Sequence, residues 1–414
     1  MPLELFRPRG LLSVVLVTVV CNCGALAQIL PPPDAIVGPP VELGPYFGAA
    51  VSTAYDNNVT QMPGGAGARD SWIDVAKLLG GFDRTFDRQH VTAYAEVDRS
   101  VYRQESLYDY TAADLRADVK SNFPSNINTD FGFSRTQTLA RAEDLNTIRR
   151  NVITTDAANG SIYFPIAVNW HSVIAGNGSL LRNSNEIDRP TNQNTAEGDL
   201  GFRYQTGAKN YVDLLARAAH TTYPDGAGTG YGNTSYRDRG AELRTVWKFS
   251  GSSQVVGHVG YLQRRYENLT LLNFSAPTYE LTYLWTPSYK TILTLYVLRQ
   301  AGPAGDSGYL EAVTHTYRIT PAYLPAEKIR LETYYQWSSL DYYGNVQVLG
   351  AGVPQSAAST SRGDADSNYG VAAMWTPLRW LMLKLDLHHE QRSSNEFQFE
   401  FSENVAMLTV QAKF

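Results

Sequence analysis

Apolar and polar residues alternate along most of the chain between Tyr46 and Phe414. The clearest segment places Leu381, Leu383, Leu385 and Leu387 between Met382, Lys384, Asp386 and His388. A helix turns by about 100° per residue and would scatter these leucines, whereas a strand keeps every second residue on one side. The same alternation recurs at 212–218, 241–249 and 329–337. The pattern therefore predicts an all-β chain.

The length of these segments indicates a membrane protein. They run over about 11 to 15 residues, whereas strands of soluble proteins are usually about 5–6 residues long. A strand that crosses a membrane needs roughly 9–11 residues in the hydrocarbon. About eighteen segments fit between Tyr46 and Phe414, at roughly 20 residues for each strand with its connection. We predict an antiparallel, up-and-down, transmembrane β-barrel of the outer membrane with about eighteen strands.

The connections alternate in length. Short ones are predicted at 207–210, 250–253, 286–288 and 376–378, and long ones at 56–70, 141–151, 183–192, 224–236 and 342–364. Outer-membrane barrels have short periplasmic turns and long extracellular loops, which sets the orientation. Trp285-Thr286-Pro287 and Trp375-Thr376-Pro377 are predicted to end strands, and Ile319-Thr320-Pro321 resembles them. The two tryptophans are expected in the periplasmic aromatic girdle.

The N-terminal segment has the order of a secretory signal peptide. Arg7 and Arg9 precede an apolar run at 11–20, and Ala25-Leu26-Ala27 provides a small-residue cleavage site. An N-terminal anchor helix is the alternative. We predict a signal peptide at 1–27 that includes both cysteines, a Pro-rich periplasmic tail at 28–44, and the barrel at 45–414. Prolines keep the tail out of the sheet because they lack the N–H group.

The C-terminus points to the same location. The residues that precede Phe414 alternate between apolar and polar, and the chain ends on an aromatic ring. This ending resembles the strand that the outer-membrane barrel-assembly machinery recognises, so Phe414 is the predicted assembly signal. A soluble secreted β-sandwich is the alternative. We therefore expect the outer membrane of a Gram-negative bacterium, with its lipid and the assembly machinery as partners.

Composition and charge exclude other classes of protein. The chain is 43% hydrophobic and 18% charged. It lacks the several apolar runs of about 18 residues that a polytopic helical protein needs. Its 12% aromatic content argues against disorder, and its net charge of −5 gives no basic surface for nucleic acid.

The charged positions of each strand are expected to face the lumen. A Lys or Arg on the lipid side near mid-membrane costs roughly 2–4 kcal/mol. The predicted lining consists of Glu96, Asp98, Asp114, Asp199, Asp213, Glu242, Glu280, Glu332 and Asp386, with Arg116, Arg203, Arg217, Arg244, Lys248, Arg330 and Lys384, and with Tyr94, Tyr110 and Tyr334. This set is nearly balanced in charge. The alternative for each charge is that it pairs with a neighbouring strand and only keeps the wall polar.

Catalytic, cofactor and metal sites are not predicted. The seven histidines are scattered, and none lies in a Ser-containing nucleophile motif or at the spacing of metal ligands. His388 and His389 are adjacent, so a regular strand would direct them to opposite faces.

Several segments resemble the EpsL type of exopolysaccharide-biosynthesis outer-membrane proteins. They are Tyr108-Asp109-Tyr110-Thr111-Ala112-Ala113-Asp114-Leu115, Arg150-Asn151-Val152-Ile153-Thr154-Thr155 and Arg182-Asn183-Ser184, with Trp170 between the last two. Tyr55-Asp56-Asn57-Asn58-Val59 also resembles the wider group of β-barrel porins. The resemblance implies a barrel that is encoded with polysaccharide synthesis and export machinery and that lets the polymer cross the outer membrane.

The predicted function is a channel that passes an exopolysaccharide through a polar lumen. Tyrosine rings with carboxylate groups suit sugars, which have apolar C–H faces and hydroxyl rims. A general or small-solute diffusion porin is the first alternative, favoured if an inward loop such as 342–364 constricts the lumen. A structural or adhesive barrel without transport is the second.

Overall fold

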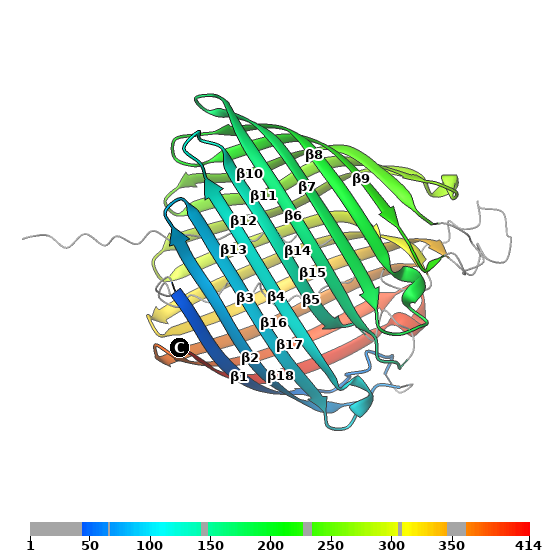
Figure 1. Ribbon diagram of the computed structural model, residues 1–414. Coiled ribbons are helices and arrows are strands. Elements are labelled where there is room, and N and C mark those ends of the chain that lie inside the picture. Colours follow the sequence, from blue (N-terminus) through cyan, green and yellow to red (C-terminus); the bar gives the residue numbers. More distant parts are fainter. Residues whose placement is uncertain (1–43, 65–66, 142–147, 227–233, 305–308, 346–361) are drawn as a thin grey trace, which may run out of the picture.

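The computed structural model describes residues 44–64, 67–141, 148–226, 234–304, 309–345 and 362–414. Eighteen antiparallel strands form a single sheet in which each strand pairs with its sequence neighbours, and β1 also pairs with β18 (Figure 1). The sheet is therefore a closed barrel, which confirms the predicted fold class. The signal peptide, its two cysteines and nearly all of the Pro-rich tail lie outside the described residues and stay predictions.

The strands are β1 (Gly44–Asp56), β2 (Ser71–Phe86), β3 (Gln89–Tyr102), β4 (Tyr110–Asn122), β5 (Asn128–Leu139), β6 (Val152–Ala167), β7 (Trp170–Asn183), β8 (Gln193–Gln205), β9 (Tyr211–Thr222), β10 (Tyr236–Ser250), β11 (Ser253–Tyr266), β12 (Phe274–Ser288), β13 (Thr291–Pro303), β14 (Tyr309–Ala326), β15 (Ile329–Asn345), β16 (Gly363–Leu378), β17 (Leu381–Ser394) and β18 (Phe401–Lys413). Short 3₁₀ turns occupy Ser106–Tyr108, Arg189–Thr191, Thr270–Leu272 and Phe397–Phe399. Among the described residues, no helix has the length and apolarity needed to cross a membrane.

The first and last strands join along a continuous seam. Register runs from Gly48 opposite Lys413 to Asp56 opposite Val405. Phe47 and Phe414 exchange backbone hydrogen bonds of 3.0 and 2.8 Å. The Phe414 ring lies 5.5 Å from the Phe47 ring and 5.6 Å from the Trp380 ring, centroid to centroid. The closed seam leaves no free sheet edge to pair with another chain.

The connections alternate in length as predicted. One end of the barrel carries the short turns 87–88, 123–127, 168–169, 206–210, 251–252, 289–290, 327–328 and 379–380. The other end carries 57–70, 103–109, 140–151, 184–192, 223–235, 267–273, 304–308, 346–362 and 395–400. Long loops are extracellular in such barrels. The end with the short turns, where β1 begins and β18 ends, is therefore periplasmic.

Two predicted turns are wrong by a few residues. β12 and β16 continue to Ser288 and Leu378, and the chain turns at 289–290 and 379–380. Register shifts follow Trp285 and Trp375, so each Trp-Thr-Pro segment forms an irregularity before the turn. Proline fits such a position because it cannot donate a ladder hydrogen bond. Ile319-Thr320-Pro321 lies inside β14 and marks no turn.

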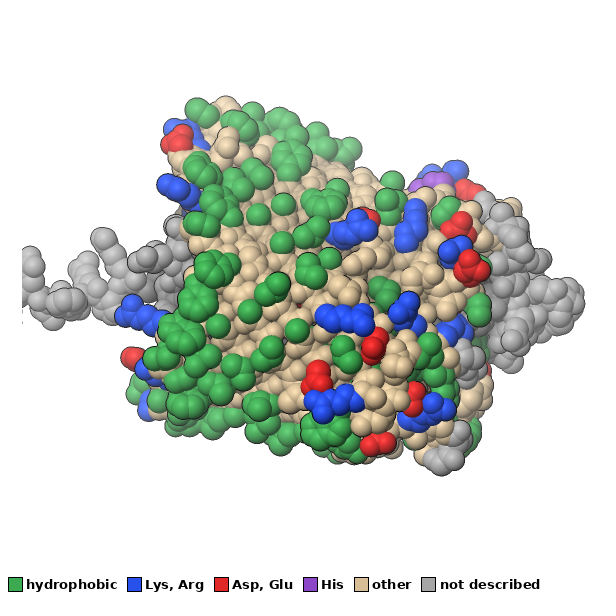
Figure 2. Space-filling view, turned by 60° about the horizontal axis from the view of Figure 1, so that its bottom comes forward, with side chains coloured by type: hydrophobic (Ala, Val, Ile, Leu, Met, Phe, Trp, Pro, Cys, Tyr) green, Lys and Arg blue, Asp and Glu red, His purple; other side chains and the backbone are tan. Residues whose placement is uncertain are grey.

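The outer wall changes in character along the barrel axis. Phe47, Phe249 and Trp375 are more than half exposed near the short-turn end, at 67%, 65% and 51%. Figure 2 shows hydrophobic side chains gathered toward that end, while charged side chains spread over the half nearer the long loops. The apolar half has the composition of a lipid-facing band with an aromatic girdle.

Candidate functional site in the barrel interior

All of the predicted lining residues share one face of the sheet. Residues that stand directly opposite each other on paired strands project to the same side of the sheet. Once one residue is assigned to a face, the register therefore assigns its partners on the neighbouring strands to the same face. Lys77 stands opposite Asp98, Asp199 opposite Arg217, and Arg244 opposite His258. Followed around the closed sheet, this register places every predicted position, from Tyr94 on β3 to Asp386 on β17, on the same side. We call this side the lumen face.

Contacts between distant strands show that this face is the interior. Arg141, which follows β5, forms an ion pair with Glu390 of β17. Arg264 of β11 pairs with Glu311 of β14. Gln61 in the first long loop lies 3.4 Å from Glu403 of β18. The first two contacts join segments that are not neighbours in the sheet, so they can form only across the inside of the barrel, whereas Gln61 follows β1, which is the neighbour of β18.

The wall formed by β8, β9 and β10 carries two groups of ion pairs. Arg203 donates two hydrogen bonds of 2.6 and 2.7 Å to Asp213. Its guanidinium lies 4.0 and 3.7 Å from the ring centroids of Tyr163 and Tyr211. This bidentate geometry between two rings fixes Arg203 against the wall, because both its charge and its faces are satisfied.

Two further arginines share carboxylates in the second group, which we call the ionic network. Arg217 lies 2.5 Å from Glu197 and 3.5 Å from Asp199, and it also pairs with Glu242. Arg244 lies 2.8 Å from Asp199 and pairs with the same Glu242. Asp199 and Glu242 thus each serve two cations, Glu197 serves one, and Glu242 is only 2% exposed. The network holds the cations at the wall instead of presenting them to solutes.

The remaining predicted residues form smaller groups on other strands. Arg116 pairs with Asp114 at 2.9 Å, Arg330 with Glu332 at 2.7 Å, and Lys384 with Asp386 at 3.1 Å. Glu96 accepts hydrogen bonds from Tyr94 and Lys77, and Glu280 accepts one from Tyr296 at 3.2 Å. Arg318 lies 4.4 Å from the Tyr334 ring centroid. Asp98 and Tyr110 stand on the same face near Lys77, whereas Lys248 lies apart at the short-turn end.

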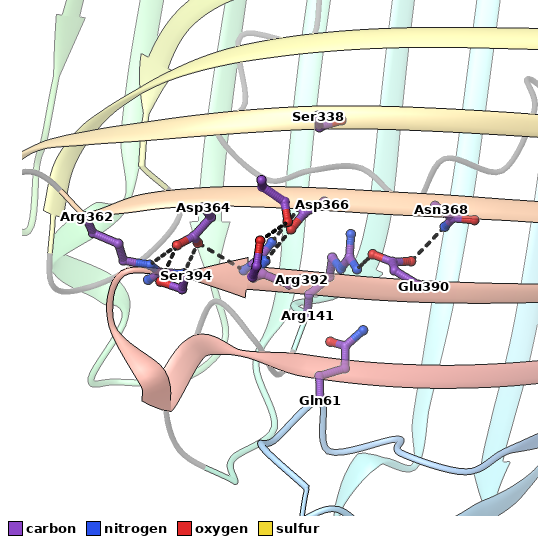
Figure 3. Close-up of polar contacts among 12 residues, drawn as sticks. Gln61, Arg141, Ser338, Arg362, Asp364, Asp366, Asn368, Glu390, Arg392 and Ser394 are labelled. Atoms are coloured by element: carbon purple, nitrogen blue, oxygen red, sulfur yellow. Dashed lines mark hydrogen bonds and ion pairs between the residues drawn. The ribbon is translucent and has the colours of Figure 1, made fainter.

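A cluster of charged residues near the long loops, shown in Figure 3, was not predicted from the sequence. Arg392 of β17 bonds both oxygens of Asp366, at 2.7 and 3.1 Å. Arg362 bonds both oxygens of Asp364, at 3.0 and 2.5 Å. Arg362 and Arg392 are buried, with 0% and 1% of their surface exposed. Lys384 and Asp386 were predicted to face the lumen. If the same alternation is continued along β17, positions 388, 390 and 392 also face the lumen, which would have identified the part of the cluster that lies on this strand.

Glu390, which lies two residues before Arg392 on β17, contacts a segment from a distant part of the barrel. It accepts a 2.8 Å hydrogen bond from Asn368 of β16 and pairs with Arg141, as Figure 3 shows. Arg141 is the residue that reaches across from the loop after β5. The contact therefore narrows the lumen close to its extracellular end.

The lumen face is more acidic than the alternating sequence pattern predicts. Register adds Asp56, Asp83, Asp118, Asp130, Glu197, Asp238, Asp364, Asp366, Glu390 and Glu403 to the predicted acids. It adds Lys77, Lys120, Arg264, Arg318, Arg392 and Lys413 to the predicted bases. Many of these residues lie outside the clear alternating segments, so pattern reasoning alone did not select them. The acids outnumber the bases on this face.

The described residues contain no group of three or more His, Cys, Asp or Glu residues that could hold a metal ion. His388 hydrogen-bonds Asp386 on the lumen face at 3.0 Å, while His389 contacts Asn404 at 3.0 Å on the outer wall. The two histidines therefore project to opposite sides, as the alternation predicted.

Comparison with known proteins identifies the family. A family model described as "Putative beta-barrel porin 2" matches residues 48–414, so the chain belongs to this family. It is an outer-membrane porin of a Gram-negative bacterium and not an enzyme. No curated protein matches the sequence. The resemblance to EpsL-type proteins stays a prediction.

Several solved outer-membrane channels are similar to this chain over most of their length, at low identity. The outer membrane protein OpdK from Pseudomonas aeruginosa gives a TM-score of 0.47 at 11% identity, covering 89% of this chain and 99% of that chain. OccK2 (OpdF) from the same organism, in complex with glucuronate, gives 0.47 at 10% identity, with 90% and 98% covered. OccAB4 from Acinetobacter baumannii gives 0.46 at 11% identity, with 90% and 98% covered.

Proposed function

We propose that this porin is a passive channel for hydroxyl-rich solutes and that in the cell it passes an exopolysaccharide across the outer membrane. The observation that carries the proposal is the state of the cations on the lumen face. Arg203, Arg217 and Arg244 are all held by wall carboxylates. A wall of this kind is polar without offering free cations that would bind an anionic solute tightly.

The same wall has features that suit sugars. Tyr94, Tyr110 and Tyr334 share the lumen face with carboxylates. Aromatic rings can pack against the C–H faces of a sugar while carboxylate oxygens accept hydrogen bonds from its hydroxyl groups. The excess of acids disfavours an acidic polymer by like-charge repulsion, so a neutral or amino-sugar polysaccharide fits the lumen best. Its partner would be the polysaccharide export machinery on the periplasmic side.

Single-channel recording tests this proposal. The purified barrel in a planar bilayer should conduct ions, and neutral oligosaccharides should block the current for times that lengthen with chain length. Sulfated oligosaccharides of the same length should block less. No conductance would contradict every transport function. A deletion strain that exports an unchanged amount of extracellular polysaccharide would contradict the cellular role alone.

A small-solute diffusion porin is the second candidate function, favoured by the ion pair between Arg141 and Glu390 across the lumen. A fixed bridge at this point would admit monosaccharides and reject a polymer. Swelling of proteoliposomes in sugars of increasing size separates the candidates. A sharp cut-off between disaccharides and longer chains would favour the small-solute porin.

A further inference from the structure

The outer wall of β10 and β11 carries three exposed arginines close to the long loops. They are Arg237, Arg239 and Arg265. Arg237 stands directly opposite Arg265 in the register, and Arg239 stands opposite Gln263, the next outward pair. His220 of β9 is opposite Arg237 on the other side. The basic side chains therefore form one patch over three neighbouring strands, here called the arginine patch.

This patch is not neutralised by the described part of the protein. Like charges directly opposite each other have Cβ atoms about 4.5–5.5 Å apart and destabilise a sheet. Glu267 lies 3.5 Å from Arg237 and 3.4 Å from His220. Among the described residues, neither Arg239 nor Arg265 has an acidic side chain within ion-pair distance. The patch thus keeps a net positive charge.

The acidic residue nearest in sequence, Asp238, does not neutralise the arginine patch. Asp238 lies between Arg237 and Arg239 but projects into the lumen, where it forms hydrogen bonds of 2.9 and 2.8 Å with Arg264. An external anion is therefore the available means of relieving repulsion in the arginine patch.

The height of the patch on the barrel indicates where that anion lies. Below Arg239, the outward positions of β10 are Ala241, Leu243, Thr245, Trp247 and Phe249. At about 3.3 Å per residue and a tilt of about 40°, the stretch from Arg239 to Phe249 spans about 25 Å along the membrane normal. This equals the usual height of the lipid-facing band, about 25 Å. The arginines therefore lie level with the headgroups of the outer leaflet.

We propose that the arginine patch binds the phosphorylated headgroup of an anionic lipid in the outer leaflet. Guanidinium groups bind phosphate oxygens in a bidentate manner, and several converging arginines match a group with several charged oxygens. In a Gram-negative outer membrane, the phosphates of lipopolysaccharide provide this chemistry at this level. The binding site is separate from the lumen and does not depend on the proposed transport function.

Lipid binding can be measured by native mass spectrometry of the full barrel in a nonionic detergent, titrated with lipopolysaccharide. The test variant combines Arg237→Gln, Arg239→Gln and Arg265→Gln. The matched control combines Arg84→Gln, Arg88→Gln and Arg379→Gln, which removes three exposed arginines at the short-turn end. Each basic residue near an anionic surface contributes about 1 kcal/mol, so the patch variant should bind at least about tenfold more weakly. The control should bind like the wild type.

Further arms identify the ligand and the mode of binding. Replacing the same three arginines with lysine should give an intermediate affinity, because lysine keeps the charge and loses the bidentate geometry. Enzymatically dephosphorylated lipopolysaccharide should bind the wild type as weakly as the patch variant binds the intact lipid. Equal affinity of wild type and patch variant, an equal loss in the control, or full displacement of the lipid by millimolar inorganic phosphate would each overturn the proposal. Retained heat-modifiable migration on gels shows that each variant is folded.

Discussion

Arg264 and Arg265 are consecutive residues of β11, yet they lie in opposite environments. Arg264 faces the lumen, is 3% exposed, and bonds Asp238 and Glu311 while its guanidinium lies 3.8 Å from the Tyr236 ring centroid. Arg265 faces outward and is exposed, with no acidic partner among the described residues. The comparison shows that strand parity decides whether an arginine is part of the protein's internal framework or available to the surroundings.

The two faces also differ in what holds them together. On the lumen face, charged side chains bond to one another across strands, as Arg217 does with Glu197 and Glu242. On the outer wall, apolar and aromatic side chains rely on lipid to cover them, as with Leu214 and Trp375 at 59% and 51% exposure. On the lumen face, a substitution that removes one member of an ion pair should therefore destabilise the barrel. On the outer wall, a substitution that introduces a charge should do so.

The largest effect is expected from Arg264→Met. This change leaves Glu311 and Asp238 without their shared cation, and Glu311 is only 3% exposed. Removing one member of a buried ion pair costs roughly 3–5 kcal/mol. Arg265→Met, the adjacent outward change, should alter stability by no more than about 0.5 kcal/mol. Denaturant unfolding of both variants in micelles makes the comparison, and similar losses would mean that parity does not separate the two arginines.

A smaller loss is expected when the outer wall of β12 acquires a charge. Leu281 faces outward and Thr282 faces the lumen at mid-strand. Leu281→Lys should lower the free energy of unfolding in a lipid bilayer by roughly 2–4 kcal/mol. Thr282→Lys should have little effect, because water and carboxylates are available in the lumen. A reversed order would show that the assigned faces are inverted.

The last strand offers the next comparison. Phe414→Ala removes ring contacts with Phe47 and Trp380, and aromatic pairs are worth about 0.5–1.5 kcal/mol each. We expect a loss of roughly 1–3 kcal/mol and, if Phe414 is the assembly signal that we propose, a much lower yield of assembled barrel in cells. Lys413→Ala, which alters the lumen side next to Tyr46, tests whether both effects are specific to the aromatic end. Normal assembly of Phe414→Ala would contradict the proposed signal.

Arg141→Ala is expected to have the smallest effect on stability. It should nevertheless change the single-channel current clearly. Removal of the cross-lumen pair with Glu390 should raise conductance and strengthen the preference for cations. Arg149→Ala is the matched control, since Arg149 lies in the same connection but pairs with Asp188 in the neighbouring loop, at 2.6 Å. Single-channel recording distinguishes the two. Unchanged conductance in Arg141→Ala would show that the pair does not narrow the path.

The strand count and the sidedness of the strands could be read from the sequence because period-two alternation is a local property. The turns after Trp285 and Trp375 could not, since a bulge extends each strand beyond its proline. The contact between Arg141 and Glu390 was also inaccessible, because it joins residues brought together only when the sheet closes. The acidic excess was missed for a related reason: Asp364 and Asp366 adjoin a long loop, where alternation gives no clear signal.

The most direct test of the central account is the reversal potential of the wild-type channel in a planar bilayer under a potassium chloride gradient. A polar lumen whose arginines other than Arg318 are held by carboxylates, and whose acids exceed its bases, should give an open channel with a modest preference for potassium. A preference for chloride would contradict this account of the lumen face, and the absence of any current would contradict transport altogether.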